Sequence, residues 1–441
     1  MKRQPPPWLH RAPILVALVA ILSPSIVAAQ VGFEGPPIDY LKAEVHDPIA
    51  TLAEELASGK KHLEHDSEHG YLKSVLEALT VPLSSQVLVF SKTSLQLHRI
   101  SPRRPRAIYF NDDTYVGWCQ RGDVIEFATT DPMQGAIFYS LSQDPELPPK
   151  FERDRGQCLT CHATSRTQNI PGFFVRSVFA DSAGQPLLGS GTYTTDATSP
   201  FDERWGGWYV TGEHGTMRHM GNQTYTEENN RNASREPGAN LTSLEDLVVT
   251  EPYLTPHSDL VALMVLEHQT QMHNAIAAAN YETRLALHQS YQMNELLGRE
   301  PGHVSDSAER RINAATEKVI KHLLFYDEFQ LTSPISGSSS YSAEFSAQGP
   351  HDSQGRSLRQ LDLTTRLLKY PCSYLIYSPA FDTLPDMVRS RVVSRLHGIL
   401  SGEIQDADYE YLPTSTRHEI LEILTATKPE FAQWAQNVAT P

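Results

Sequence analysis

The chain has 441 residues, 40% of them hydrophobic, so it can bury a large core, and its length suggests two or three domains. Its 52 acidic residues outnumber 37 basic ones, and an acidic chain repels phosphate backbones, which argues against nucleic-acid binding. Four cysteines are too few for a scaffold built on disulfides.

The first residues have the three-part layout of a secretory signal peptide. Lys2 and Arg3 precede an apolar run at 14–22, and the small residues 27–29 follow. The run is too short to cross a hydrocarbon core of roughly 30 Å, and no later segment has the length of a spanning helix. We expect cleavage after Ala29 and a periplasmic chain without a transmembrane segment, with 34 basic and 52 acidic residues and a formal charge of −18. The alternative is an uncleaved N-terminal anchor.

The pattern from residue 30 to 83 is helical, because leucines recur there at three- and four-residue spacing among charges. From residue 84 to 220 the chain is rich in β-branched and aromatic runs separated by turn formers, which predicts antiparallel strands. The expected strands before the cysteine motif are 87–90, 107–110, 115–119, 124–128 and 136–141.

Strand signals resume after a Pro-rich break and the cysteine motif. The expected strands there are 173–179, 187–194 and 205–211, with a hairpin turn at 181–184. Residues 221–242 are read as a surface loop, and residues 243–441 as a helical region. Its expected elements are a helix capped at Ser258-Asp259 and running to Leu297, helices at 308–325, 384–400 and 416–426, and a Ser-rich loop at 336–340. The predicted fold class is α+β, with a mainly antiparallel β region that contains the motif.

Cys158, Cys161 and His162 form a Cys-x-x-Cys-His motif. Covalent haem attachment needs two thiols that meet the two vinyl groups of one porphyrin, and a neutral imidazole that reaches the iron. Export fits this chemistry, because c-type haem is attached outside the cytoplasm. The motif therefore predicts one covalently attached haem c, with His162 as the proximal iron ligand.

Two other kinds of site also use a closely spaced pair of cysteines, a zinc site and a thioredoxin-like redox site. A zinc site needs a second ligand pair with close spacing, and a thioredoxin-like redox pair needs a βαβ context. The chain shows neither pattern, which favours haem.

The sequence leaves the sixth iron ligand open. The donors His214, Met217, His219 and Met220 crowd one glycine-rich segment, and His268 lies on the apolar stripe of a predicted helix. A methionine would raise the redox potential, a histidine would lower it, and an open position would permit ligand chemistry. For each of these residues taken singly, an ordinary structural role is the alternative.

Other residues have two interpretations each. Forked arginine side chains near these segments can pair with haem propionates or serve as ordinary charge: Arg153, Arg155, Arg204 and Arg218. The aromatic residues of 205–209 can pack on the porphyrin or fill the core of the sheet. Cys119 and Cys372 can form a disulfide in an oxidising compartment or remain buried, inert thiols.

Several segments have counterparts in one known group of proteins: 84–94, 108–113, 158–162, 204–212, 356–359 and 370–374. Through them, most of the mature chain resembles large exported bacterial proteins with a single c-type haem motif. The resemblance implies a cytochrome c-type protein, and only the three motif residues carry over with a defined role. It does not imply the small all-helical cytochrome c fold, because strands are expected on both sides of the motif.

We expect this protein to transfer single electrons in the periplasm with an unidentified redox partner, and the chain to tune the iron through axial ligands and burial. The chain is much larger than a one-haem carrier requires, so two alternatives stay open. One is a haem enzyme, an oxidase or peroxidase, in which His214, His219 or His268 is the distal acid or base. The other is a haem-based sensor or binding module.

Overall fold

The computed structural model describes residues 1, 32–230, 232–429, 431 and 433, so nearly all of the expected signal peptide (1–29) lies outside the described residues. The chain contains both helices and an antiparallel sheet, which confirms the α+β class. In the described part of the chain, no helix is long and apolar enough to span a membrane.

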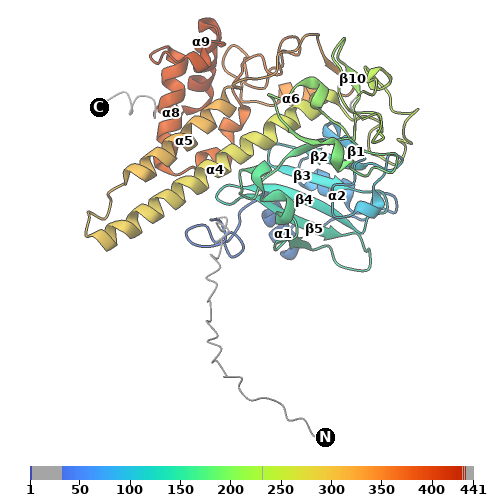
Figure 1. The fold of residues 1–441 in the computed structure, drawn as a ribbon, viewed down its shortest axis with the longest axis horizontal. Coiled ribbons are helices and arrows are strands. Elements are labelled where there is room, and N and C mark those ends of the chain that lie inside the picture. The colour runs from blue at the N-terminus through green and yellow to red at the C-terminus, as the bar shows by residue number, and fades with distance from the viewer. Residues whose placement is uncertain (2–31, 231, 430, 432, 434–441) are drawn as a thin grey trace.

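The strands gather in the first half of the chain and the long helices in the second (Figure 1). The helices are α1 (Pro48–Ala57), α2 (Leu72–Ala78), α3 (Leu159–His162), α4 (Leu260–Leu297), α5 (Asp306–Leu323), α6 (Tyr341–Ala347), α7 (Pro379–Asp382), α8 (Asp386–Ser401) and α9 (Thr414–Thr427). The strands are β1 (Val87–Val89), β2 (Arg106–Phe110), β3 (Thr114–Trp118), β4 (Val124–Asp131), β5 (Gly135–Ser142), β6 (Phe151–Arg153), β7 (Val175–Val178), β8 (Thr192–Thr195), β9 (Trp208–Tyr209), β10 (Gly212–Glu213) and β11 (Ser336–Gly337).

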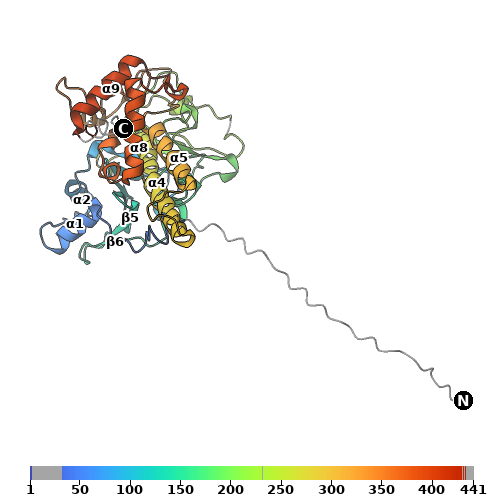
Figure 2. The same ribbon diagram turned by 90° about the vertical axis from the view of Figure 1, so that its left-hand side faces the viewer.

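The main sheet has seven strands in the order β6-β5-β4-β3-β2-β1-β9. The strands from β1 to β6 pair antiparallel with their neighbours in sequence, and β9 returns after the motif to pair with β1. Because side chains alternate across a strand, the sheet has two faces of different composition. Figure 2 shows it between α1 and α2 on one side and α4 on the other.

The face toward α1 and α2 is closed. Its side chains are buried against residues of those two helices, and they include Leu88, Tyr109, Val116, Phe127, Ile137 and Leu141. The opposite face is closed only in part. Phe110, Tyr115, Ala136 and Phe138 join the core built around α4, whereas Ile108 and Ala128 are only partly buried.

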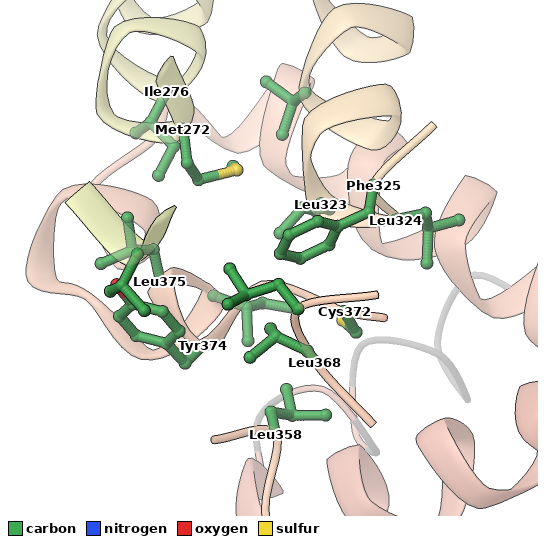
Figure 3. Close-up of a cluster of buried hydrophobic side chains, with 14 of the residues drawn as sticks. Met272, Ile276, Leu323, Leu324, Phe325, Leu358, Leu368, Cys372, Tyr374 and Leu375 are labelled. Carbon is green, nitrogen blue, oxygen red and sulfur yellow. The ribbon is translucent and has the colours of Figure 1, made fainter. Parts of the chain in front are cut away.

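Helix α4 begins where the sequence predicted, because the side chain of Asp259 accepts hydrogen bonds from the first free N–H groups of the helix. Its apolar face packs against α5 and the segments that follow. Figure 3 shows Met272 and Ile276 of α4 facing Phe325, with Leu368 and Cys372 in the same core.

Three expectations need correction. The helical pattern of 37–79 forms two helices, α1 and α2, separated by irregular chain. The end of the Pro-rich break forms the edge strand β6, which pairs with β5. The loop expected at 336–340 begins with β11, because that segment pairs with β10 beside the N-terminus of α4.

Candidate haem site

The motif lies on one short helical turn, α3. The carboxylate of Asp154 accepts hydrogen bonds from the backbone N–H groups of Gly156 and Cys158, at 2.9 and 3.0 Å, and so fixes the start of the turn. The N–H groups of Cys161 and His162 both donate to the carbonyl of Cys158. Both motif cysteines are free thiols, Cys158 partly buried and Cys161 exposed. The turn thus presents two thiols three residues apart, with the imidazole directly after them.

The orientation of His162 is set by one backbone group. Its Nδ1 lies 2.9 Å from the carbonyl oxygen of Gly172, which only accepts, so Nδ1 carries the proton. Nε2 keeps its lone pair and has no hydrogen-bond partner among the described residues. Burial lowers the pKa of His162, so the ring is neutral at pH 7. This is the tautomer and charge that an iron-binding histidine needs.

The loop that orients His162 is held in turn by α4. Asn274 accepts a hydrogen bond from the N–H of Phe173 at 2.8 Å and donates to the carbonyl of the same residue at 2.6 Å. Gly172 fits tightly beneath these contacts, because a Cβ there would lie 2.4 Å from Oδ1 of Asn274 and 2.9 Å from Cβ of Thr167. The long helix therefore fixes the carbonyl that orients the ligand.

Apolar surface surrounds the imidazole. The rings of Phe138 and Phe174 lie 4.9 Å from it, centroid to centroid. Beside Phe138, on the neighbouring strand β4, lies the partly buried Ala128. The partly buried Ile108 lies farther along this face, on β2 and in register with Gly117 and Glu126. Small and apolar side chains next to two thiols and a neutral imidazole fit a flat, largely apolar group such as a porphyrin.

Charged groups lie near the motif as well. Burial raises the pKa of the Cys158 thiol to about 12, and Asp154 and Glu126 add to the effect. The charges of Arg106 and Glu126 act on both Cys158 and His162, which places this ion pair close to the motif.

Arg176, which the sequence did not single out, lies close enough to Cys161 and Arg166 for their charges to act on it. Burial and the charge of nearby Arg166 lower the pKa of Arg176, whereas Cys161 acts to raise it. Among the described residues neither Arg176 nor Arg166 has a carboxylate within ion-pair distance; Nε of Arg176 donates to Thr192.

Most of the arginines proposed from the sequence are already engaged. Arg204 pairs with Glu267 in the buried core, and Arg218 pairs with Glu236. Arg153 donates to backbone carbonyls of the N-terminal segment.

The two candidate histidines of the glycine-rich segment lie together, with ring centroids 4.8 Å apart. Both nitrogens of His214 are used: Nδ1 donates to the carbonyl of Met217, and Nε2 accepts from the N–H of Asn240. Nδ1 of His219 accepts from the N–H of Gly221, so its proton is on Nε2, which is buried without a partner. Burial lowers both pKa values, and iron binding by either ring would require one of these hydrogen bonds to break.

The other candidate ligands are also packed into cores. Met220 is fully buried against Phe179 and Tyr225, and its sulfur accepts a hydrogen bond from Ser177 at 3.6 Å. Met217 lies buried in the main core.

Nε2 of His268 is hydrogen-bonded to the hydroxyl oxygen of Ser373 at 2.8 Å, and its ring stacks on that of Phe325 with the ring centroids 4.0 Å apart. In the described part of the chain, no contact joins it or the candidates at 214–220 to His162. Each therefore remains a prediction as a sixth ligand.

Two other questions from the sequence have structural answers. Cys119 and Cys372 are buried free thiols, so the alternative of two unpaired cysteines holds. Trp205 is buried against Phe201 and His219, while the indole N–H of Trp208 donates to the carbonyl of Arg176. The aromatic segment thus fills the core and contacts the strand beside the motif.

A surface hollow of about 520 Å³ lies at the start of α6 and contains no motif residue. It is lined by Leu83, Ser84, Thr255, His257, Ser338, Ser339, Ser340 and Glu344. The Glu344 carboxylate there already accepts hydrogen bonds from two serines, Ser84 and Ser340.

Sequence reasoning missed the groups that position and flank His162. Gly172 and Asn274 are far apart in sequence and carry no motif. Glu126 lies in a predicted strand and Arg106 directly before another, and a charge at such positions is normally read as facing solvent. Only the pairing of these strands brings the two charges together.

Among the described residues, no group of three or more His, Cys, Asp or Glu side chains is arranged to hold a metal ion. Comparison of the chain with protein-family models, with curated proteins and with solved structures found no significant match.

Proposed function

We propose that this chain is a c-type cytochrome that holds one haem through Cys158 and Cys161, with His162 as the proximal iron ligand. One observation carries the proposal. On the turn that bears both free thiols, Nδ1 of His162 is bound to the Gly172 carbonyl and Nε2 is left free. When bound, haem supplies a one-electron redox couple. The protein supplies the ligand, its orientation and an apolar wall.

We further propose that the protein exchanges single electrons with a partner protein in the periplasm. Cys161 is exposed, so a porphyrin joined to it has one edge near the surface, where a partner can approach. Arg166 and Arg176 lack carboxylate partners among the described residues, which suits them to propionates. Export is supported by the sequence of residues 1–29.

Haem staining after denaturing electrophoresis tests the attachment, because thioether bonds survive unfolding. We expect the exported wild type to stain, and a Cys158→Ala, Cys161→Ala double variant to lose the stain. Cys119→Ala is the matched control, because it removes a buried thiol elsewhere and should keep the stain. A variant without residues 1–29 should accumulate without covalent haem. An unstained wild type would refute the attachment, and stained protein from the shortened variant would refute the localisation.

A specific observation favours a second candidate, a haem protein that binds a ligand at an open sixth position. The candidate ligands His214, Met217, His219, Met220 and His268 are all buried in other contacts. We expect a high-spin iron in the optical and EPR spectra, and no change in the spin state when each candidate is replaced by alanine. A low-spin wild type that one of these substitutions converts to high spin would instead identify that residue as the ligand.

A further inference from the structure

The partly exposed area of the main sheet carries one ion pair. Nη2 of Arg106 on β2 lies 2.6 Å from Oε2 of Glu126 on β4. The arginine reaches across the intervening strand because Gly117 has no side chain; a Cβ there would lie 2.1 Å from Nη2 of Arg106. The pair is only slightly exposed, 19% for Arg106 and 12% for Glu126.

The pair is incompletely satisfied. Oε1 of Glu126 accepts hydrogen bonds from Ser94 and Gln96, so the carboxylate is held in place. The guanidinium of Arg106 is less completely bonded than the Glu126 carboxylate, because its Nε is buried without a hydrogen-bond partner among the described residues. A buried charged donor without an acceptor costs folding free energy, unless a bound ligand or water accepts its hydrogen bond.

Strand register places this pair beside the motif. Glu126 is paired with Ser140, two residues from Phe138 on the same strand, so both side chains share one face, about 7–8 Å apart diagonally. The Phe138 ring contacts the ring of His162. The electrostatic influence of Arg106 and Glu126 on Cys158 and His162 agrees with this placement.

We propose that, with haem held at His162, Arg106 and Glu126 would form a ligand-binding site in the haem pocket, and that Arg106 would donate a hydrogen bond to a small ligand of the iron. The ligand class is a diatomic molecule or a short anion whose outer atom accepts a hydrogen bond. This inference rests on the proposed attachment of haem at His162. Guanidinium suits the role because it keeps its charge and has five N–H donors.

A propionate is a poorer occupant for this site. A propionate beside Glu126 would place two carboxylates together. Arg166 and Arg176, on the other hand, have no carboxylate partner in the described part of the chain. The ion pair is therefore assigned to the iron ligand, and the unpaired arginines to the propionates.

The test uses the exported holoprotein, with cyanide as the ferric probe and carbon monoxide as the ferrous probe. We expect Arg106→Leu to keep its covalent haem and to bind cyanide about 10- to 100-fold more weakly, the loss of one charged hydrogen bond. The C–O stretching frequency should rise in Arg106→Leu. The positive charge of Arg106 near the oxygen of carbon monoxide weakens the C–O bond, and the substitution removes this charge. Arg106→Lys should recover part of both changes.

Arg311→Leu is the matched control, because Arg311 forms a similar ion pair with Glu282 in the helical region. It should leave cyanide affinity and the C–O frequency unchanged. Glu126→Gln, which keeps the side-chain shape, should also shift the C–O frequency.

Two results would overturn the inference while the attachment of haem stands. One is a stained Arg106→Leu protein with wild-type cyanide affinity and C–O frequency. The other is a stained wild type that binds neither probe. A wild type without haem stain would overturn both proposals.

Discussion

The two faces of the main sheet are built by the same strands, but one face is buried against α1 and α2 and the other is only partly covered. On the closed face, Tyr109, Val116 and Phe127 are buried against α1 and α2. On the other face, Ile108 and Ala128, the sequence neighbours of Tyr109 and Phe127, stay partly exposed. Ala128 pairs with Phe138 beside the motif, and Ile108 is in register with Glu126 through Gly117. The alternation of a β-strand thus lets one segment close a core and, one residue away, contribute to the proposed haem site.

Polar groups on the two faces differ in the same way. On the closed face, the buried carboxylate of Asp47 accepts hydrogen bonds from the N–H groups of Ile49 and Ala50 and from the hydroxyl of Tyr139. On the other face, Nε of Arg106 has no partner. Among the described residues, the proposed site therefore has a charged donor without a partner, whereas the Asp47 carboxylate accepts three hydrogen bonds.

The largest effect is expected on the closed face. Leu141→Ala removes a fully buried side chain and should lower the free energy of unfolding by about 2–5 kcal/mol. In a haem-free background made by Cys158→Ala and Cys161→Ala, Ile108→Ala should cost less than about 1 kcal/mol, because its side chain is already partly exposed. With haem attached, the cost of Ile108→Ala should rise and that of Leu141→Ala should not. Urea unfolding measures the loss of unfolding free energy for both substitutions in both backgrounds. An equal loss for Ile108→Ala with and without haem would mean that haem does not bind on this face.

The next effect concerns the link from α4 to His162. Asn274→Ala leaves the N–H of Phe173 without its acceptor and should cost about 1–3 kcal/mol of folding free energy. It should also change the optical spectrum, because the Gly172 carbonyl that orients His162 loses its support.

Asn294→Ala is the control, on the same helix and with a similar hydrogen bond to the carbonyl of His303. It should lower stability comparably without changing the spectrum. An unchanged spectrum in Asn274→Ala would mean that the loop holds His162 without this helix.

Gly117→Ala should have a smaller effect on stability, within about 1 kcal/mol, because the new Cβ meets the movable end of Arg106. Displacing that end from Glu126 should still weaken cyanide binding, as Arg106→Leu does. Gly302→Ala is the control, since an added Cβ there meets nothing within 4 Å. Wild-type cyanide affinity in Gly117→Ala would show that the reach of Arg106 across β3 is unimportant.

Local patterns predicted the elements well, because they depend on neighbours in sequence. The first five strands and α4 begin and end within a few residues of the expected positions. Strand β9 falls inside the expected strand 205–211. Strand β11 escaped because its pairing is long-range: its partner β10 is more than a hundred residues away.

The site was predictable only where a motif encodes it. The spacing of Cys158, Cys161 and His162 predicts haem attachment from the sequence alone, whereas the hydrogen bond from Nδ1 of His162 to Gly172 is visible only in three dimensions. The possible iron ligands at 214–220 are close to one another in sequence, but in the fold His214 and His219 contact each other and His214 is hydrogen-bonded within the same segment. Spatial neighbours such as Glu126 cannot be found without the register of the strands.

The smallest expected effect is a pH dependence on the closed face. Burial raises the pKa of Asp47 above its ordinary value of 3.8, despite three hydrogen bonds to the carboxyl group. The folded state then holds the proton more tightly than the unfolded state. Asp47 therefore adds stability below about pH 4, and this contribution declines as the pH rises through the folded-state pKa, by about 1.4 kcal/mol for each unit of the shift. The stability of the wild type minus that of Asp47→Asn should accordingly fall as the pH rises above about 4 in urea unfolding. A difference that grows over this range would mean that the hydrogen bonds from α1 and Tyr139 outweigh burial, and that the closed face also stabilises a charge.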